Sequence, residues 1–90
     1  MTTAVTSGIF TGTGAGNSMI LHGDFNVSLS GFGTATVQLQ RSFDGGVVWK
    51  TIDSYTSDIE KRGSEIEGGV RYRFNCITYT SGTIVYRLSQ

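Results

Sequence analysis

Few side chains in this sequence could carry out chemistry. His22, the only histidine, stands two residues before Asp24, and an imidazole beside a carboxylate could transfer protons. No nucleophile pattern accompanies them. Cys76, the only cysteine, lies within an apolar alternation that predicts a buried packing thiol. One histidine, one cysteine and scattered acids do not supply the spaced ligands of a metal site, so the sequence predicts no catalytic residue, no metal and no cofactor.

A glycine-rich segment near the start is the other candidate for ligand chemistry. The segment Gly12-Thr-Gly14-Ala-Gly16 is not followed by the Lys-Ser/Thr of a phosphate-binding loop, and Asn17 stands where a dinucleotide-binding fingerprint has its last glycine. We therefore expect residues 1–16 to form a flexible Gly/Thr-rich arm or an edge strand.

Length and charge limit the partners of the chain. Ninety residues with a formal net charge of zero fit one small domain, expected at residues 17–90, without an overall field that would attract nucleic acid or an anionic membrane. The first residues lack the basic and apolar segments of a signal peptide, and no apolar run approaches the roughly 20 residues of a membrane span. We expect a protein made in a cytoplasm, with no membrane partner and no specific nucleic-acid partner.

The elements that must position any site are predicted to be β-strands. Glycine and threonine are abundant, proline is absent, and apolar residues alternate with polar ones between the glycines. Four segments alternate cleanly, each with three apolar residues on one face: Phe25, Val27 and Leu29; Ala35, Val37 and Leu39; Tyr72, Phe74 and Cys76; Ile84, Tyr86 and Leu88. Further strands are expected at 19–21 and 47–52, with an edge strand at 3–10. This spacing predicts an all-β, antiparallel sandwich.

Glycine-containing turns separate these strands. Asp44-Gly45-Gly46 can supply the positive φ angles of a tight hairpin, and Gly31-Phe32-Gly33, Gly68-Gly69 and Ser81-Gly82 mark other reversals. Residues 53–67 lack clear alternation and hold five of the seven acids. This acidic stretch is a loop, an edge strand or a short helical turn.

The predicted hairpin resembles a known motif. Ser42-Phe-Asp44-Gly-Gly46-Val-Val-Trp49 is similar to the Asp-box, the Ser-x-Asp-x-Gly-x-Thr-Trp hairpin of sialidase propellers and other β proteins, and departs from it at Val48. In such a hairpin the Asp44 carboxylate can accept backbone N–H groups, Gly46 allows a positive φ and Trp49 packs beneath. The resemblance implies a structural role remote from any catalytic site.

The strand that begins at Gly69 resembles the penultimate strand of fibronectin type III domains, on the run Gly69-Val-Arg-Tyr72-Arg-Phe74-Asn-Cys76. The resemblance implies an immunoglobulin/fibronectin type III-like sandwich, in which Tyr72 is a corner tyrosine whose hydroxyl bonds back to the preceding turn. The tryptophan that the family carries on an early strand is missing, and Phe25 is expected to fill its space.

The outer face of the predicted sheet is a candidate interaction surface. If the strands concerned pair in one sheet, these polar side chains project together: Gln38, Gln40, Arg71, Arg73, Asn75 and Arg87. We call this set the polar face. Guanidinium groups can grip carboxylates through two hydrogen bonds, so the acidic stretch of a neighbouring copy is a natural partner for head-to-tail association. The alternative is an ordinary solvated face, which is routine in antiparallel sheets.

Taken as a whole, the chain resembles small bacteriophage virion proteins. The resemblance rests on the run 37–49, the strand around Tyr72 and the closing run 81–88, and it covers residues 23–90. It implies a non-enzymatic structural component of the virion, either a capsid decoration (cement) protein or a head-to-tail or tail accessory protein. Its partners would be other virion proteins and further copies of itself.

A carbohydrate-binding or adhesion module is the alternative. Phe32, Tyr55 and Tyr79 fall outside the clean alternations, where aromatic rings could stack on sugars. A glycan-binding protein should show at least two such rings on one exposed ridge, whereas a virion protein should bury them against a partner. A glycosidase fragment would need paired catalytic carboxylates on a larger scaffold.

Overall fold

The computed structural model describes residues 5–90, and all regular structure in this range is β-strand. The strands are β1 (Val5–Phe10), β2 (Gly14–Ala15), β3 (Met19–Ile20), β4 (Gly23–Phe32), β5 (Ala35–Ser42), β6 (Lys50–Tyr55), β7 (Ile59–Glu65), β8 (Arg71–Tyr79) and β9 (Gly82–Ser89). A helix with the length and apolar character needed to cross a membrane is not found in residues 5–90. The all-β prediction is confirmed.

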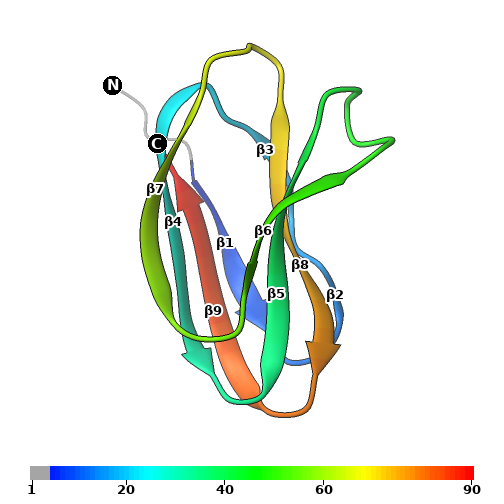
Figure 1. Cartoon of the computed structure of the whole chain (residues 1–90), viewed down its shortest axis with the longest axis vertical. Coiled ribbons are helices and arrows are strands. Elements are labelled where there is room, and N and C mark those ends of the chain that lie inside the picture. The colour runs from blue at the N-terminus through cyan, green and yellow to red at the C-terminus, as the bar shows by residue number, and fades with distance from the viewer. Residues whose placement is uncertain (1–4) are drawn as a thin grey trace.

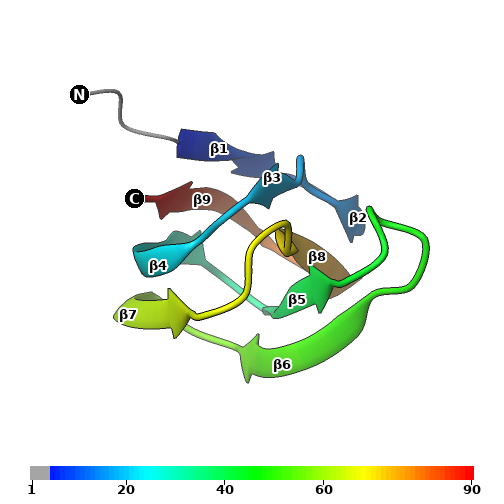
Figure 2. The same ribbon diagram turned by 90° about the horizontal axis from the view of Figure 1, so that it is seen from above.

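The strands form two antiparallel sheets (Figures 1 and 2). One sheet has the order β1-β9-β4-β7, and the other has the order β2-β8-β5-β6, with β3 also paired to β8. The two sheets face each other across one core (Figure 2). The antiparallel sandwich predicted from the alternation is therefore the observed architecture.

The predicted apolar faces form this core. All twelve residues of the four clean alternations are buried, and none is more than 6% exposed. Aromatic rings connect the sheets: Phe74 of β8 lies 5.7 Å from Tyr86 of β9, and Phe25 of β4 lies 4.9 Å from Tyr72 of β8, measured between ring centroids. Phe25 therefore packs in the core against the Tyr72 ring.

The strand order differs from that of an immunoglobulin domain. The last two strands of that fold are neighbours in one sheet, whereas β8 and β9 lie in different sheets here, and β9 lies between β1 and β4. When β2 and β3 are counted as one interrupted strand, every connection except the β5–β6 hairpin crosses from one sheet to the other. Eight strands in this order form a double-sheet jelly roll.

The N-terminal segment is part of the sandwich from residue 5 onward. β1 is an edge strand, one of the two forms expected, and pairs with β9 from Val5↔Ser89 to Phe10↔Ile84. β2 pairs with β8, and the Gly16 N–H donates to the Phe74 carbonyl at 2.8 Å. The boundary expected after residue 16 therefore does not divide the fold. The expectation for residues 1–4 lies outside the described residues.

The acidic stretch contains a complete edge strand, β7, together with the end of β6. An edge strand that leaves most of its side chains exposed needs no strict alternation, which explains why the pattern is weak here. Gly63 of β7 lies against the Phe25 ring, where an added Cβ would be 2.5 Å from the nearest ring atom. Of the three alternatives for residues 53–67, the edge strand is the one observed.

The β5–β6 connection is longer than the predicted tight hairpin. β6 begins at Lys50 instead of near Val47, so residues 43–49 form an extended loop. Gly45 and Gly46 adopt positive φ angles of 75° and 101° within it. The apolar pair Val47-Val48 belongs to this loop and not to a strand, so the expected start of the strand was wrong.

Candidate functional site

The polar face is only partly assembled in the structure. Five of its six residues lie on the neighbouring strands β5 and β8: Gln38, Gln40, Arg71, Arg73 and Asn75. The sixth, Arg87, is exposed on β9, which belongs to the other sheet. The expectation that Arg87 shares this face is wrong, because the jelly-roll order separates the last two strands that an immunoglobulin-like order would keep together.

Hydrogen bonds tie the polar face together. The Arg73 Nε donates to Gln40 Oε1 at 3.0 Å, and the Gln40 Nε2 donates to Gln38 Oε1 at 3.3 Å. Thr51 of β6 donates its hydroxyl to the same Gln38 oxygen at 2.9 Å. Burial lowers the pKa of the Arg73 guanidinium. Three of the predicted contact residues, Gln38, Gln40 and Arg73, are thus hydrogen-bonded within the protein's own surface. Fewer of their polar groups are left to bind a partner's carboxylates.

The Asp-box-like hairpin is held by its own polar residues. The Ser42 hydroxyl donates to Asp44 Oδ1 at 2.6 Å and accepts the Gly46 N–H at 2.9 Å, while Asp44 Oδ1 also accepts the Val48 N–H at 2.9 Å. The Trp49 indole N–H donates to the Gly46 carbonyl at 3.0 Å. The hydrogen bonds from Ser42 and Val48 hold the pKa of the Asp44 carboxyl below its usual range.

This hairpin reaches over the polar face. The Trp49 ring lies 4.2 Å from the guanidinium carbon of Arg73, a distance at which a cation attracts an aromatic face. The hairpin and the polar face, which the sequence presented as separate features, therefore form one surface in the structure.

Tyr72 makes a polar connection between the two sheets. Its hydroxyl donates to Glu65 Oε1 at 2.7 Å, and Arg41 Nη1 donates to the same oxygen at 3.1 Å. The fibronectin resemblance implied a bond to the preceding turn, whereas the acceptor is a buried carboxylate at the end of β7. Burial acts to raise the pKa of Glu65. The hydrogen bonds from Tyr72 and from the Glu67 N–H, together with the charge of Arg41, have the larger, opposite effect. The pKa of Glu65 therefore lies below its usual range.

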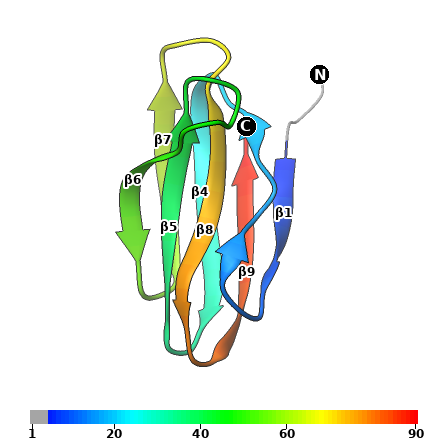
Figure 3. The same cartoon turned by 90° about the vertical axis from the view of Figure 1, so that its right-hand side faces the viewer.

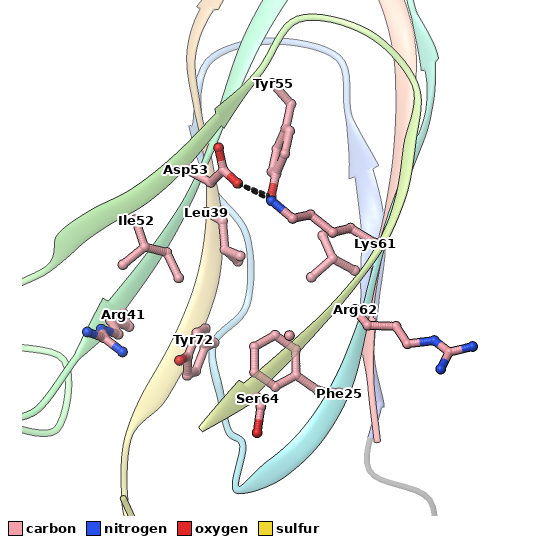
Figure 4. A pocket seen from close by; sticks show the side chains of 12 residues that line it. Phe25, Leu39, Arg41, Ile52, Asp53, Tyr55, Lys61, Arg62, Ser64 and Tyr72 are labelled. Atoms are coloured by element: carbon pink, nitrogen blue, oxygen red, sulfur yellow. Dashed lines mark hydrogen bonds and ion pairs between the residues drawn. The ribbon is translucent and has the colours of Figure 1, made fainter. Parts of the chain in front are cut away.

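A cleft opens between the edge strands β6 and β7 (Figure 4). Its volume is about 270 Å³, and Phe25, Ile52 and Tyr72 are among its lining residues. The Lys61 ammonium and Asp53 Oδ2 meet at 2.8 Å, and the Tyr55 hydroxyl donates to the same oxygen at 3.0 Å. Apolar, aromatic, acidic and basic side chains line this cleft, although no sequence motif predicted it.

Asp53 and Tyr55 in the cleft are not poised to exchange protons near neutral pH. The hydrogen bond from Lys61 holds the pKa of Asp53 below its usual range. Burial and the bond to Asp53 raise the pKa of Tyr55 well above its usual range. Asp53 therefore stays ionised and Tyr55 stays protonated. In residues 5–90 no three His, Cys, Asp or Glu side chains gather closely enough to hold a metal ion.

An apolar patch at one end of the sandwich was missed by the sequence analysis. Val47 is 82% exposed in the β5–β6 loop, and Ile66 is 93% exposed in the β7–β8 loop. Phe43 and Val48 of the first loop are also exposed. Both loops project from the same end of the sandwich (Figures 1 and 3). We call Phe43, Val47, Val48 and Ile66 the loop patch. The sequence feature that belongs to this patch, the pair Val47-Val48, was interpreted as the start of a strand.

The aromatic residues considered for sugar stacking do not form an exposed ridge. Tyr55 is buried at 7% exposure, and Phe32 and Tyr79 pack partly buried against the core. The Tyr79 hydroxyl donates to the Gly82 carbonyl. His22 and Asp24 are exposed, and the backbone of His22 is hydrogen-bonded to the Gln90 side chain. The condition set for a glycan-binding protein is not met by these three rings.

Comparison with known proteins bears on the fold alone. No protein-family model matches the chain, and no curated protein matches it. Among solved structures it is similar to the Yersinia pseudotuberculosis-derived mitogen (YPM), with a TM-score of 0.59 and 20% sequence identity over 98% of this chain and 83% of that chain. This neighbour shares the all-β fold. It is a mitogen and not a phage protein, so the phage resemblance rests on the sequence motifs alone.

Proposed function

We propose that the chain is a non-enzymatic structural protein of a bacteriophage virion, either a capsid decoration protein or a head–tail or tail accessory component, which acts by binding other virion proteins. The observation that carries the binding role is the loop patch. Three of its four members are aliphatic, and all four are exposed on two loops at the same end of the sandwich (Figures 1 and 3). Large apolar side chains exposed together at one end of a small protein are a candidate protein–protein contact.

Two further features support this proposal. The jelly roll is an architecture of viral capsid domains, and the runs 37–49 and 81–88 are those on which the chain resembles small virion proteins. The non-enzymatic part of the proposal is supported by the cleft, where Asp53 and Lys61 neutralise each other. This role would place the chain in the virion.

A carbohydrate-binding or adhesion module remains the second candidate, because jelly rolls also occur in lectins. It has less support, since Phe32, Tyr55 and Tyr79 pack toward the core. The activity of the mitogen is not carried over, because the likeness at 20% identity concerns the fold.

The proposal is tested on particles of the phage that encodes the chain. Density-gradient-purified particles should contain the chain at a constant ratio to the major capsid protein, measured by quantitative mass spectrometry. The double variant Val47→Asp/Ile66→Asp should be reduced roughly tenfold in particles, the effect of losing about 1.4 kcal/mol of binding free energy. Ile77→Asp is the matched control, because Ile77 is an exposed aliphatic residue on β8, outside the loop patch.

The same experiment can contradict the proposal. Particles that lack the chain after washing would overturn the virion role. Equal retention of the double variant and the wild type would show that the loop patch does not bind the particle. Specific binding in a glycan array would replace the proposal with the second candidate.

A further inference from the structure

β1 differs from the other edge strands of the sandwich in having no protection against pairing with another chain. Natural edge strands are usually shortened, charged or bulged, because a free edge otherwise pairs with a further strand. β2 and β3 have two residues each, β6 contains Lys50 and Asp53 and pairs with β5 through an irregular register, and β7 contains Glu60, Lys61, Arg62 and Glu65. β1 reads Val-Thr-Ser-Gly-Ile-Phe and pairs with β9 in continuous register.

We infer that the free edge of β1 pairs antiparallel with β1 of a second copy, around a two-fold axis through Ser7. The two four-stranded sheets would then become one continuous sheet. β1 is the outermost strand of its sheet, and among the described residues it pairs with β9 alone (Figure 3). The inference rests on the proposed function, because it names a second copy as one partner in assembly.

The side chains of β1 select this register. Val5, Ser7 and Ile9 point outward, and Val5 and Ile9 are 43% and 59% exposed, whereas Thr6 and Phe10 are buried. A shift by one residue would set outward side chains against inward ones. An axis at Ser7 places Val5 of each copy opposite Ile9 of the other, with Cβ atoms about 5 Å apart. An axis at Gly8 keeps the faces matched but sets Ser7 against Ile9, and so loses both aliphatic pairs.

Charge also favours a second β1 as the partner. An uncharged strand is best matched by another uncharged strand, and β6 and β7 both carry charges. Arg87 lies on β9 opposite Ser7, so the two Arg87 side chains of the dimer would be three strand spacings apart, about 14 Å. That separation exceeds the screening length of about 8 Å at physiological salt. Repulsion between the arginines therefore does not oppose the pairing.

The aliphatic contact extends beyond the two edge strands. Val85 of β9 lies opposite Ile9 and is exposed on the same outer face. In the dimer, Val85 and Ile9 of one copy and Val5 of the other would form one row of aliphatic side chains across the sheet. The two-fold axis would generate a second, identical row. Hydrogen-bonded edges and two aliphatic rows together provide a self-complementary, closed contact.

Light scattering after size exclusion tests the inference with the full chain. The wild type should pass from a 9.7 kDa monomer to twice that mass as concentration rises. Ile9→Lys places a charge on the edge at an exposed position and should raise the dimer dissociation constant at least about tenfold. Ile77→Lys, on the other sheet, should leave it unchanged. Circular dichroism and thermal unfolding verify that each variant is folded.

Disulfide trapping tests the register. In the proposed dimer two Ser7 residues face each other, so Ser7→Cys should form a covalent dimer under mild oxidation. Val5→Cys is the matched control, because the two Val5 residues would be four residues apart along the strands, about 14 Å, and should stay unlinked. A wild type that is monomeric up to millimolar concentration, or a link formed by Val5→Cys and not by Ser7→Cys, would overturn the inference.

These results are distinguishable from those on virion particles. A monomeric chain that is retained in particles would overturn the β1 contact and leave the virion role standing. A dimeric chain that is absent from particles would overturn the virion role and support the β1 contact.

Discussion

The hydroxyl of Tyr72 lies 2.7 Å from Glu65 Oε1 and joins β8 in one sheet to β7 in the other. Arg41 of β5 donates to the same oxygen at 3.1 Å. One carboxylate therefore connects three strands, β5, β7 and β8. It lies on the side of the sandwich where the cleft opens between β6 and β7. Glu65 is 4% exposed, so these two donors and the Glu67 N–H replace most of the hydration of its charge.

Removing the Tyr72 hydroxyl should weaken this connection. Tyr72→Phe leaves the buried Glu65 carboxylate with one side-chain donor fewer, so we expect the free energy of unfolding to fall by about 1–3 kcal/mol. Urea unfolding followed by the fluorescence of Trp49 measures the change. Ser28→Ala, which removes an exposed hydroxyl–carboxylate bond to Glu60, is the control and should change stability by less than about 0.5 kcal/mol. Equal effects of the two variants would contradict the role assigned to Tyr72.

Stability should fall as the solution is acidified. The pKa of Glu65 is lowered in the folded protein, so its contribution is present above the unfolded glutamate pKa of about 4.3 and is lost as pH falls through the lower, folded pKa. The pKa values of Asp44 and Asp53 are lowered too, which adds to the decline. Urea unfolding between neutral pH and about pH 3 should show a shallower decline for Glu65→Gln than for the wild type. Parallel curves would contradict this prediction.

Phe74 tests the strand assignment on which the whole core depends. Its side chain is fully buried and lies 5.7 Å from the Tyr86 ring. Phe74→Ala should lower the free energy of unfolding by about 3–5 kcal/mol, because the substitution leaves a cavity between the sheets. A soluble variant with the wild-type thermal transition would contradict the assignment. Circular dichroism on heating provides the measurement.

The core could be predicted from the sequence, but the strand order could not. Alternation such as Phe25, Val27 and Leu29 indicates which side of a strand faces inward, and this information is local. The same alternation fits every antiparallel sandwich. The pairing of β1 with β9 joins residues at opposite ends of the described chain, and no local pattern marks it. The jelly roll was therefore missed, and Arg87 was assigned to the wrong sheet.

The candidate surfaces also differ in how far the sequence predicts them. Ser42, Asp44, Gly46 and Trp49 are close in sequence, and their hydrogen bonds could be anticipated from the motif. The Asp53–Lys61 pair and the loop patch arise where separate edges and loops meet, so they emerge only with the strand order. The burial of Glu65 could not be predicted, because Tyr72 and Arg41 come into contact with it only in the folded structure.

Gly63 should not tolerate a side chain. An added Cβ would lie 2.5 Å from the Phe25 ring, so Gly63→Ala should force this ring to move, at a cost of about 1–3 kcal/mol. Gly68→Ala is the matched control, because a Cβ there meets no atom within 4 Å. Thermal unfolding of the two variants decides the question. A Gly63→Ala protein as stable as Gly68→Ala would show that the ring has room to shift.

Asp44 should control the position of Trp49, the only tryptophan. Asp44→Ala removes the acceptor of the Ser42 hydroxyl and the Val48 N–H. The loop should then loosen and the indole should leave Arg73, so its fluorescence emission should shift to the red while overall stability changes by less than about 1 kcal/mol. Asp24→Ala, at an exposed position in β4, should leave the emission unchanged. An unshifted spectrum for Asp44→Ala would show that other contacts hold the indole.

The place of β9 between β1 and β4 has a consequence for synthesis on the ribosome. β9, which follows the other eight described strands in the chain, lies inside its sheet, so β1 and β4 have no shared neighbour until Ser89 has been synthesised and has left the exit tunnel. Pairings between strands so distant in sequence form slowly. Until then β1 presents two free edges instead of one. Nascent chains are therefore most prone to misassociate before β9 has emerged from the exit tunnel, and slower initiation, which spaces ribosomes apart on the message, should raise the soluble yield.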